Sequence, residues 1–470
     1  GPSDDIHAGS TGDIVMSEFW LEGDLYLNTQ KMVASAAHLN GSSIVGAEAF
    51  TSFGGWREHP ATLKTRGDIL WCEGINRFIF HTYTHQPWNI SPGVTFGPYG
   101  LDFNRHNTWW EQGKAYMDYL GRSQFLLQYG RTVADVLVFT GESSPNDGIF
   151  RADIKALGHD YDHIGTNMLK ELSVNDGLIH SPVGGVYKML VLPETTWMTP
   201  DLIDKIDQLV RAGAIVAGPK PLKSPSLKGY PDCDAKVVSM AERIWDESGK
   251  ITKGKVITNL SVNEILNELK FAPDFSGGES GFDLSFIHRT SDEADIYFIA
   301  NPRNISRQEN CSFRIIGKYP QIWDSKTGEM REAPVWKEKP DGTTEVPVFL
   351  ESDGSVFVVF SNNNCFTPKH IVQFEADLIR EELRPLEGLK IIKAEYGQFL
   401  PKGLEDATKG VLNLLARGPF DIHSGTYLVD TEPAAGVVKE LRIECVVGGE
   451  RHRFHALEGQ SVLIDIKSVD

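Results

Sequence analysis

Basic residues are scarce in this chain. Its 470 residues include 46 lysines and arginines against 64 aspartates and glutamates, which gives a formal net charge of −18. A nucleic-acid partner would require a basic surface, and an anionic membrane surface attracts basic proteins as well. We therefore expect no nucleic acid and no membrane among the partners of this protein.

Paired cysteines and long apolar runs are also missing. The five cysteines are scattered without a C-x-x-C pair, so their spacing predicts neither a zinc site nor a disulfide framework. We expect them to be buried, small apolar residues. No uninterrupted apolar run approaches the ~18–20 residues of a membrane-spanning helix. The hydrophobic content of 41% still supplies material for several cores, and a chain of this length can hold about three domains.

Residues 1–130 have the rhythm of strands separated by helices. Three short apolar runs read as strands: 13–16, 43–46 and 77–80. Three segments have helical spacing: 30–39, 60–74 and 109–127. This alternation predicts a parallel sheet. Glu18 and Glu48 are expected just past the first two strands, and His81 follows the third. Polar groups at successive strand ends are typical of the site of a (β/α) barrel.

Residues 131–275 predict a doubly wound α/β domain. Three near-continuous apolar runs read as buried parallel strands: 134–139, 188–192 and 214–217. An amphipathic helix is expected from Thr199 to Gly213. No cysteine nucleophile lies between residues 131 and 232, and the polar cluster at 159–163 lacks a nucleophile as well. We therefore interpret this amidotransferase-like domain as a scaffold.

The rest of the chain is rich in β-strand signals. Apolar runs at 294–300 and 355–360 predict a β-sandwich over residues 276–370. A charged stretch at 375–387 reads as a helical or linker segment, and a last β-rich domain is expected over 385–470. The predicted fold class is thus α/β plus all-β.

Two glutamates are the candidates for acid–base chemistry. Glycoside hydrolysis commonly needs two carboxyl groups that flank the scissile bond. Glu48 follows Ile-Val-Gly-Ala, whose small residues let a backbone crowd a barrel interior; the alternative is a surface glutamate paired with a lysine. Glu18 lies beside Phe19 and Trp20, which could raise its pKa or offer a stacking face to a sugar. Its oxygens would equally suit calcium.

Histidines and aromatic residues accompany these carboxylates. His81 and His85 are four positions apart, a spacing that suggests zinc on a helix, but they straddle a predicted strand end. We favour hydrogen bonds to sugar hydroxyls, with a core histidine as the alternative. The pair Trp109-Trp110, with Arg105 nearby, is either a stacking platform or ordinary helix packing.

Five motifs carry a family resemblance: Asp13-Ile-Val-Met-Ser-Glu18-Phe-Trp, Ala47-Glu48-Ala-Phe-Thr, Gly74-Ile-Asn-Arg77, His81-Thr-Tyr-Thr-His85-Gln-Pro and Thr108-Trp-Trp. They are similar to glycoside hydrolase family 106, the α-L-rhamnosidases. The similarity continues to Ala394-Glu-Tyr-Gly397 and covers nearly the whole chain. It implies inverting hydrolysis of terminal α-L-rhamnosides in a rhamnose-containing glycan or glycoside, with a calcium ion that helps to hold the sugar.

The resemblance also implies roles for single residues. Glu48 falls at the position of the catalytic base, and Glu18 at an active-site carboxylate near the substrate or the metal. The candidates for substrate binding are Trp20, His81, His85, Arg105 and Trp109.

Members of this family place a complete barrel ahead of the point where this chain begins. The resemblance thus implies the C-terminal half of an enzyme, with only the last strands of a (β/α)₈ barrel and with the general acid upstream of Gly1. We expect a second chain or segment to carry the earlier strands, and we expect the protein to be secreted or periplasmic. Two alternatives are a β-galactosidase-like glycoside hydrolase and a non-catalytic glycan-binding subunit.

Overall fold

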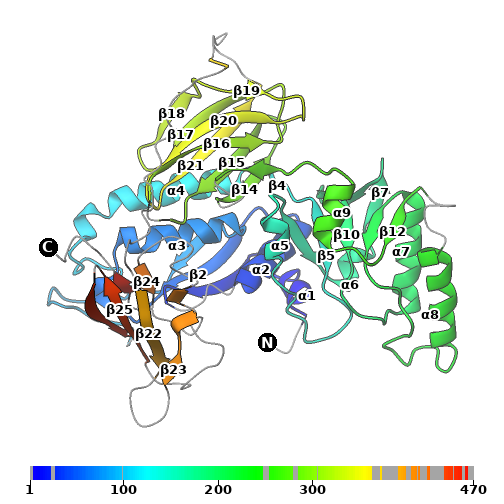
Figure 1. Cartoon of the computed structure of the whole chain (residues 1–470), viewed down its shortest axis with the longest axis horizontal. Coiled ribbons are helices and arrows are strands. Elements are labelled where there is room, and N and C mark those ends of the chain that lie inside the picture. Colours follow the sequence, from blue (N-terminus) through cyan, green and yellow to red (C-terminus); the bar gives the residue numbers. More distant parts are fainter. Residues whose placement is uncertain are drawn as a thin grey trace.

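The computed structural model of the chain contains several sheets that follow one another along the sequence (Figure 1). It describes residues 4–22, 27–97, 99–246, 253–278, 284–303, 305–362, 371–372, 390–397, 404–409, 411–412, 421–423, 439–447, 449–457 and 461–463. Across these ranges, every helix is too short or too polar to cross a membrane.

The first part of the chain forms a parallel sheet in the order β1-β2-β3. Its elements are α1 (Asp5–Gly9), β1 (Val15–Trp20), α2 (Leu27–Leu39), β2 (Val45–Thr51), α3 (Pro60–Cys72), β3 (Arg77–Phe80) and α4 (Lys114–Gln128). The parallel sheet and its intervening helices are confirmed. However, β1 and β2 continue past Glu18 and Glu48, so these glutamates lie within the strands rather than just beyond them.

Local sequence explains the borders of α3. Pro60 occupies the first turn, where its missing N–H costs nothing, and His59 and Thr62 form a capping box. Gly74 follows the helix with a φ of +103°, a conformation that favours glycine. Along one face, α3 contacts β14 (Ser285–Thr290) and β15 (Ala294–Ala300) of the later sandwich, so this part of the chain shares a core with it (Figure 1).

The second part forms a five-stranded parallel sheet in the order β12-β11-β10-β5-β6. Its strands are β5 (Val136–Phe139), β6 (Tyr161–Ile164), β10 (Met189–Val191), β11 (Ile215–Ala217) and β12 (Lys255–Ile257). The helices that pack on it are α5 (Ala152–Lys155), α7 (Pro200–Ala212), α8 (Cys233–Ala241) and α9 (Val262–Glu268). α5 and α9 share a core with one face, and α7 and α8 share a core with the other.

The third part is a pair of antiparallel sheets. Their orders are β18-β17-β21-β15-β14-β4 and β13-β16-β20-β19, and their side chains meet in one core. The strands are β4 (Arg131–Thr132), β13 (Phe275–Ser276), β14 (Ser285–Thr290), β15 (Ala294–Ala300), β16 (Arg307–Phe313), β17 (Tyr319–Asp324), β18 (Glu329–Glu332), β19 (Lys337–Glu338), β20 (Thr344–Leu350) and β21 (Ser355–Ser361). The two strands expected here from the apolar runs, which correspond to β15 and β21, are confirmed.

The C-terminal region adds two further sheets, in the orders β23-β22-β25-β26 and β24-β27. The strands are β22 (Lys390–Gly397), β23 (Leu404–Asp406), β24 (Asp421–His423), β25 (Glu440–Val447), β26 (Glu450–Leu457) and β27 (Ser461–Leu463). The charged stretch at 375–387 lies outside the described residues. Of the five cysteines, Cys365 also lies outside them, and the other four are buried, as expected.

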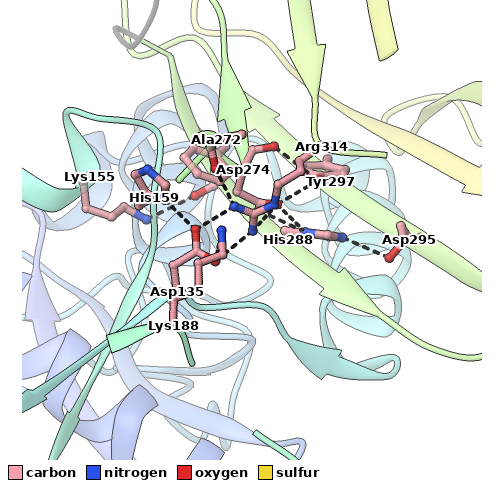
Figure 2. Close-up of polar contacts among 11 residues, drawn as sticks. Asp135, Lys155, His159, Lys188, Ala272, Asp274, His288, Asp295, Tyr297 and Arg314 are labelled. Carbon is pink, nitrogen blue, oxygen red and sulfur yellow. Dashed lines mark hydrogen bonds and ion pairs between the residues drawn. The ribbon is translucent and has the colours of Figure 1, made fainter. Parts of the chain in front are cut away.

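A buried charge network joins the five-stranded parallel sheet to the sandwich (Figure 2). Its centre is Asp135, which precedes β5 and accepts hydrogen bonds at 2.7 and 2.9 Å from Arg314, the residue after β16. Lys188 lies 3.1 Å from the same carboxylate, and His159 is hydrogen-bonded to it. Burial would raise the pKa of Asp135, but His159, Arg314 and Lys188 together hold it far below its usual range.

Candidate active site

The two candidate glutamates lie side by side on one face of the first sheet. Glu18 of β1 is in register with Glu48 of β2, and Glu48 is in register with Ile79 of β3. Side chains on a strand alternate between the faces, so Met16 joins them while Val15 and Phe19 point to the covered side.

This face is open among the residues that the structure describes. The side chain of Glu48 is 43% exposed, and its apolar neighbours Met16 and Ile79 are 46% and 41% exposed. By contrast, the residues next to Glu48 along β2 are fully buried. A tightly packed backbone thus holds a carboxylate in an accessible position. We call this surface the "β1–β3 face" and define it by Met16, Glu18, Glu48 and Ile79.

His81 lies beside Glu48. Its Nε2 is 4.0 Å from Glu48 Oε1, and its side chain is mostly buried. Its Nδ1 is buried and has no hydrogen-bond partner in the described part of the chain. The ring contacts Phe96 edge-on and stacks at a longer distance on Tyr99. Geometry therefore places an imidazole with spare hydrogen-bonding capacity next to the candidate base.

Glu18 is hydrogen-bonded to Trp20, which belongs to a cluster of aromatic rings. The indole N–H of Trp20 donates a 2.6 Å hydrogen bond to Glu18 Oε1, which fixes the carboxylate along its own strand. The Trp20 ring lies 5.1 Å from Phe53 and 5.8 Å from Tyr99, measured between centroids. Phe53 and Tyr99 are largely exposed. Exposed rings beside carboxylates suit a ligand that is apolar on one face and hydroxylated at its edge, such as a sugar.

The other three residues predicted to bind the substrate are Arg105, Trp109 and His85. Arg105 donates to the carbonyl oxygens of Gln86 and Trp88 at 2.9 and 3.0 Å and so braces that loop. Trp109 is half-buried and donates at 2.8 Å to the carbonyl oxygen of Glu58. His85 is exposed. The contacts of Arg105 and Trp109 are those of loop and helix packing, the second of the two readings left open for them.

Sequence reasoning missed a second carboxylate site near Trp20. Oε1 of Glu22 accepts hydrogen bonds from Ser52 Oγ at 2.7 Å and from the backbone N–H groups of Phe53 and Gly54 at 2.9 and 3.2 Å. Its Oε2 is buried and has no hydrogen-bond partner among the described residues. The available signal was the Ser-Phe-Gly-Gly turn after β2, because consecutive N–H groups of such a turn form an anion-binding nest.

One more carboxyl group near the site has a shifted pKa. Burial raises the pKa of Asp102, which lies in a loop with a φ of +47°. For a metal, Glu18 and Glu22 could each supply oxygen donors. The described residues bring no group of three or more histidine, cysteine, aspartate or glutamate side chains close enough together to hold an ion.

Comparison with known proteins places these features in a family. A family model described as alpha-L-rhamnosidase matches residues 1–337. A protein of Formosa agariphila named "Putative beta-glucuronidase" is 48% identical over 465 residues, which are 99% of this chain and 39% of that protein. The chain thus spans about two fifths of the length of this curated relative.

Solved structures are also similar. A rhamnosidase from Novosphingobium sp. PP1Y matches with a TM-score of 0.73 at 29% identity, over 86% of this chain and 39% of that one. A beta-galactosidase from Bacillus circulans sp. alkalophilus matches with a TM-score of 0.47 at 10% identity, over 76% of this chain and 62% of that one. The second score is too low to support an argument. The family model and the first structure agree, and this chain belongs to glycoside hydrolase family 106, the alpha-L-rhamnosidase family.

Proposed function

We propose that this chain forms one wall of the site of a glycoside hydrolase that cleaves terminal α-L-rhamnosides with inversion, and that Glu48 is its general base. One observation carries the proposal: Glu48 is held by a buried strand, opens onto the exposed β1–β3 face, and has His81 and an aromatic cluster beside it. Family membership supports the substrate class.

Glu48 fits the task of a base. In an inverting reaction, the base carboxylate takes a proton from water as the water attacks the anomeric carbon, and a second carboxylic acid protonates the leaving oxygen. The exposed carboxylate of Glu48 leaves room for that water, while its buried neighbours keep the side chain in place. His81 would hold a sugar hydroxyl with a ring nitrogen.

Glu18 is a poor candidate for the acid of an inverting pair, because it stands on the strand next to Glu48 and its carboxylate accepts a hydrogen bond from Trp20. Residues in register on neighbouring strands have backbones about 4.8 Å apart. The carboxyl groups of an inverting pair are ~6.5–9.5 Å apart, whereas ~5–5.5 Å is typical of a retaining pair. Oε1 of Glu18 is also occupied by Trp20. We therefore assign Glu18 to the binding of the sugar or of calcium, and the acid to a residue outside this chain.

The open sheet supports the need for a further segment. In the described part of the chain, β1 and β3 each pair on one side only, and Met16 and Ile79 are exposed on the face that a closed barrel would bury. We propose that a second chain or segment supplies the earlier barrel strands and the acid. Calcium bound partly through Glu18 and a secreted or periplasmic location belong to the same proposal.

A second candidate substrate comes from the name of the Formosa agariphila relative, which is 48% identical to this chain. It would be a β-glucuronoside. The β-galactosidase-like and non-catalytic readings predict β-galactoside cleavage and sugar binding without turnover, respectively.

One set of assays separates these readings. The complete protein is incubated with aryl α-L-rhamnoside, aryl β-glucuronide and aryl β-galactoside, and the first-formed sugar anomer is followed by proton NMR. We expect release from the rhamnoside alone, with β-L-rhamnose as the first product. Release of α-L-rhamnose would mean retention and would favour Glu18 and Glu48 as a retaining pair. Turnover of another substrate alone would reject the substrate assignment.

A further inference from the structure

The five-stranded sheet carries a large cavity that the predicted scaffold role does not explain. The cavity has a volume of about 1050 Å³ and lies where the carboxyl ends of β5, β10, β11 and β12 meet the loops that follow them. This volume is slightly above the ~300–1,000 Å³ typical of small-molecule sites. In open parallel sheets, ligands bind in the crevice outside the carboxyl ends of the strands.

The floor of the cavity is one row of residues across the sheet. His163, Val138, Val191, Ala217 and Ile257 follow one another in register on β6, β5, β10, β11 and β12, and all of them line the cavity. Four of the five are aliphatic. The floor therefore offers an apolar surface with one imidazole at its end.

His163 is 0% exposed, and neither ring nitrogen has a side-chain hydrogen-bond partner among the described residues, while the backbone of Val138 lies close enough to raise its pKa slightly. The three other members of the polar cluster at 159–163 are paired: His159 with Asp135, Asp160 with Lys31, and Asp162 with His38. A buried, unpartnered polar group is costly, so its presence next to a cavity points to a ligand. Burial lowers the pKa of His163 to about 4, which keeps the ring neutral, with one donor and one acceptor.

A glycine covers the edge of this imidazole. Gly148 lines the cavity with a φ of +64°, and a Cβ on it would lie 3.1 Å from Cε1 and 3.3 Å from Nδ1 of His163. A side chain at this position would crowd the ring.

Four of the five charged side chains that line the cavity form two ion pairs, and Glu194 adds a further carboxylate. Arg151 donates from Nε and Nη2 to both carboxylate oxygens of Asp153 at 2.8 and 2.6 Å. Lys220 donates to Asp246 at 2.7 Å. A phosphate or nucleotide would have to displace these carboxylates. The other polar lining residues include hydroxyl and amide side chains: Thr196, Thr258 and Asn259.

We propose that this cavity binds a neutral sugar, with one face of the sugar ring on the aliphatic floor and a hydroxyl group hydrogen-bonded to His163. A hydroxyl both donates and accepts, as a neutral imidazole does, and a neutral ligand leaves the two rim ion pairs intact. The site shares no residue with the β1–β3 face, so it goes beyond the function proposed above.

The test is a titration of the complete protein with L-rhamnose, D-galactose and cellobiose, and with sodium glucuronate and inorganic phosphate, by calorimetry and saturation-transfer NMR. Two variants address the cavity: His163→Phe removes both nitrogens at similar size, and Ala217→Leu fills the floor. His180→Phe is the matched control on β8 (Leu178–His180), and Trp20→Ala reports on the β1–β3 face.

We expect a neutral sugar to bind, and each cavity variant to weaken this binding at least tenfold while the controls leave it unchanged. His163→Phe should keep or raise the melting temperature, because it removes an unsatisfied polar group. Three results would overturn the proposal: no binding by any neutral probe, tighter binding of phosphate or glucuronate, or binding that only Trp20→Ala weakens. The last result would leave the proposed glycosidase function intact. Conversely, a protein that hydrolyses none of the aryl glycosides but still binds a neutral sugar in the cavity would reject the proposed function and leave the cavity proposal intact.

Discussion

Replacing Asp135 by asparagine would remove the carboxylate at the centre of the buried charge network (Figure 2). Asp135 is 4% exposed and is shared by Arg314, Lys188 and His159. An asparagine has nearly the same size, so the change deletes the charge without opening a cavity. The two cations would then be left in a poorly hydrated position.

The expected loss of stability depends on the contacts that Arg314 and Lys188 retain after the substitution. Breaking a buried ion pair by removing one partner costs about 3–5 kcal/mol. Arg314 retains an ion pair with Asp274 at 3.1 Å and a hydrogen bond to the carbonyl oxygen of Ala272, and Lys188 is about one fifth exposed. The remaining contacts of Arg314 and the partial exposure of Lys188 both reduce the loss of stability. We therefore expect Asp135→Asn to lower the free energy of unfolding by about 3 kcal/mol, at the lower end of that range.

Urea unfolding followed by tryptophan fluorescence and circular dichroism measures this loss. The matched control is Asp118→Asn, which removes an exposed i,i+4 pair with Lys114 and should cost far less, because water and salt screen an exposed pair. Because the pKa of Asp135 is depressed in the folded chain, its contribution is present above the unfolded pKa of about 3.9 and is lost as the pH falls through the folded value. A loss at pH 7 no larger than that of the control would show that the Asp135 carboxylate does not stabilise the fold.

Two further stability predictions follow from buried groups. His288 lies between two aspartates, and although burial lowers its pKa, they raise it above the usual value. Its contribution is therefore complete below about pH 6.5 and is lost as the pH rises through the raised pKa, so His288→Gln should flatten the fall in melting temperature on the alkaline side. Trp71 is fully buried between α3 and the sandwich, where its ring meets Phe298 edge-on, and Trp71→Ala should cost about 3–5 kcal/mol in urea unfolding. The exposed Trp88→Ala serves as its control and should change stability by less than about 0.5 kcal/mol.

The elements with strong periodic signals could be predicted from the sequence. The helix expected from Thr199 to Gly213 is α7, Pro200–Ala212, because a proline at its start, an amphipathic stripe and a glycine with positive φ at its end agree. The apolar runs of β15 and β21 were equally clear. The exact ends of β1 and β2 could not be predicted, because pairing between strands carries a polar Glu18 and Glu48 into the sheet against their local preference.

The candidate site was predicted in part. The sequence pattern brought Glu18 and Glu48 together, and the register places them opposite each other. It could not reveal Glu22, whose importance depends on backbone N–H groups of a turn about thirty residues away. Nor could it separate His163 from its paired neighbours, since their partners Lys31, His38 and Asp135 come from distant segments.

The turnover of Glu48→Gln in the complete protein shows whether Glu48 is the base of a glycosidase site. With aryl α-L-rhamnoside as substrate, kcat should fall by about 10²–10⁴-fold, because general base catalysis supplies a factor of that size. KM should change little, and the exposed Glu329→Gln should behave like the unmodified protein. Undiminished kcat in Glu48→Gln would mean that Glu48 is not the base.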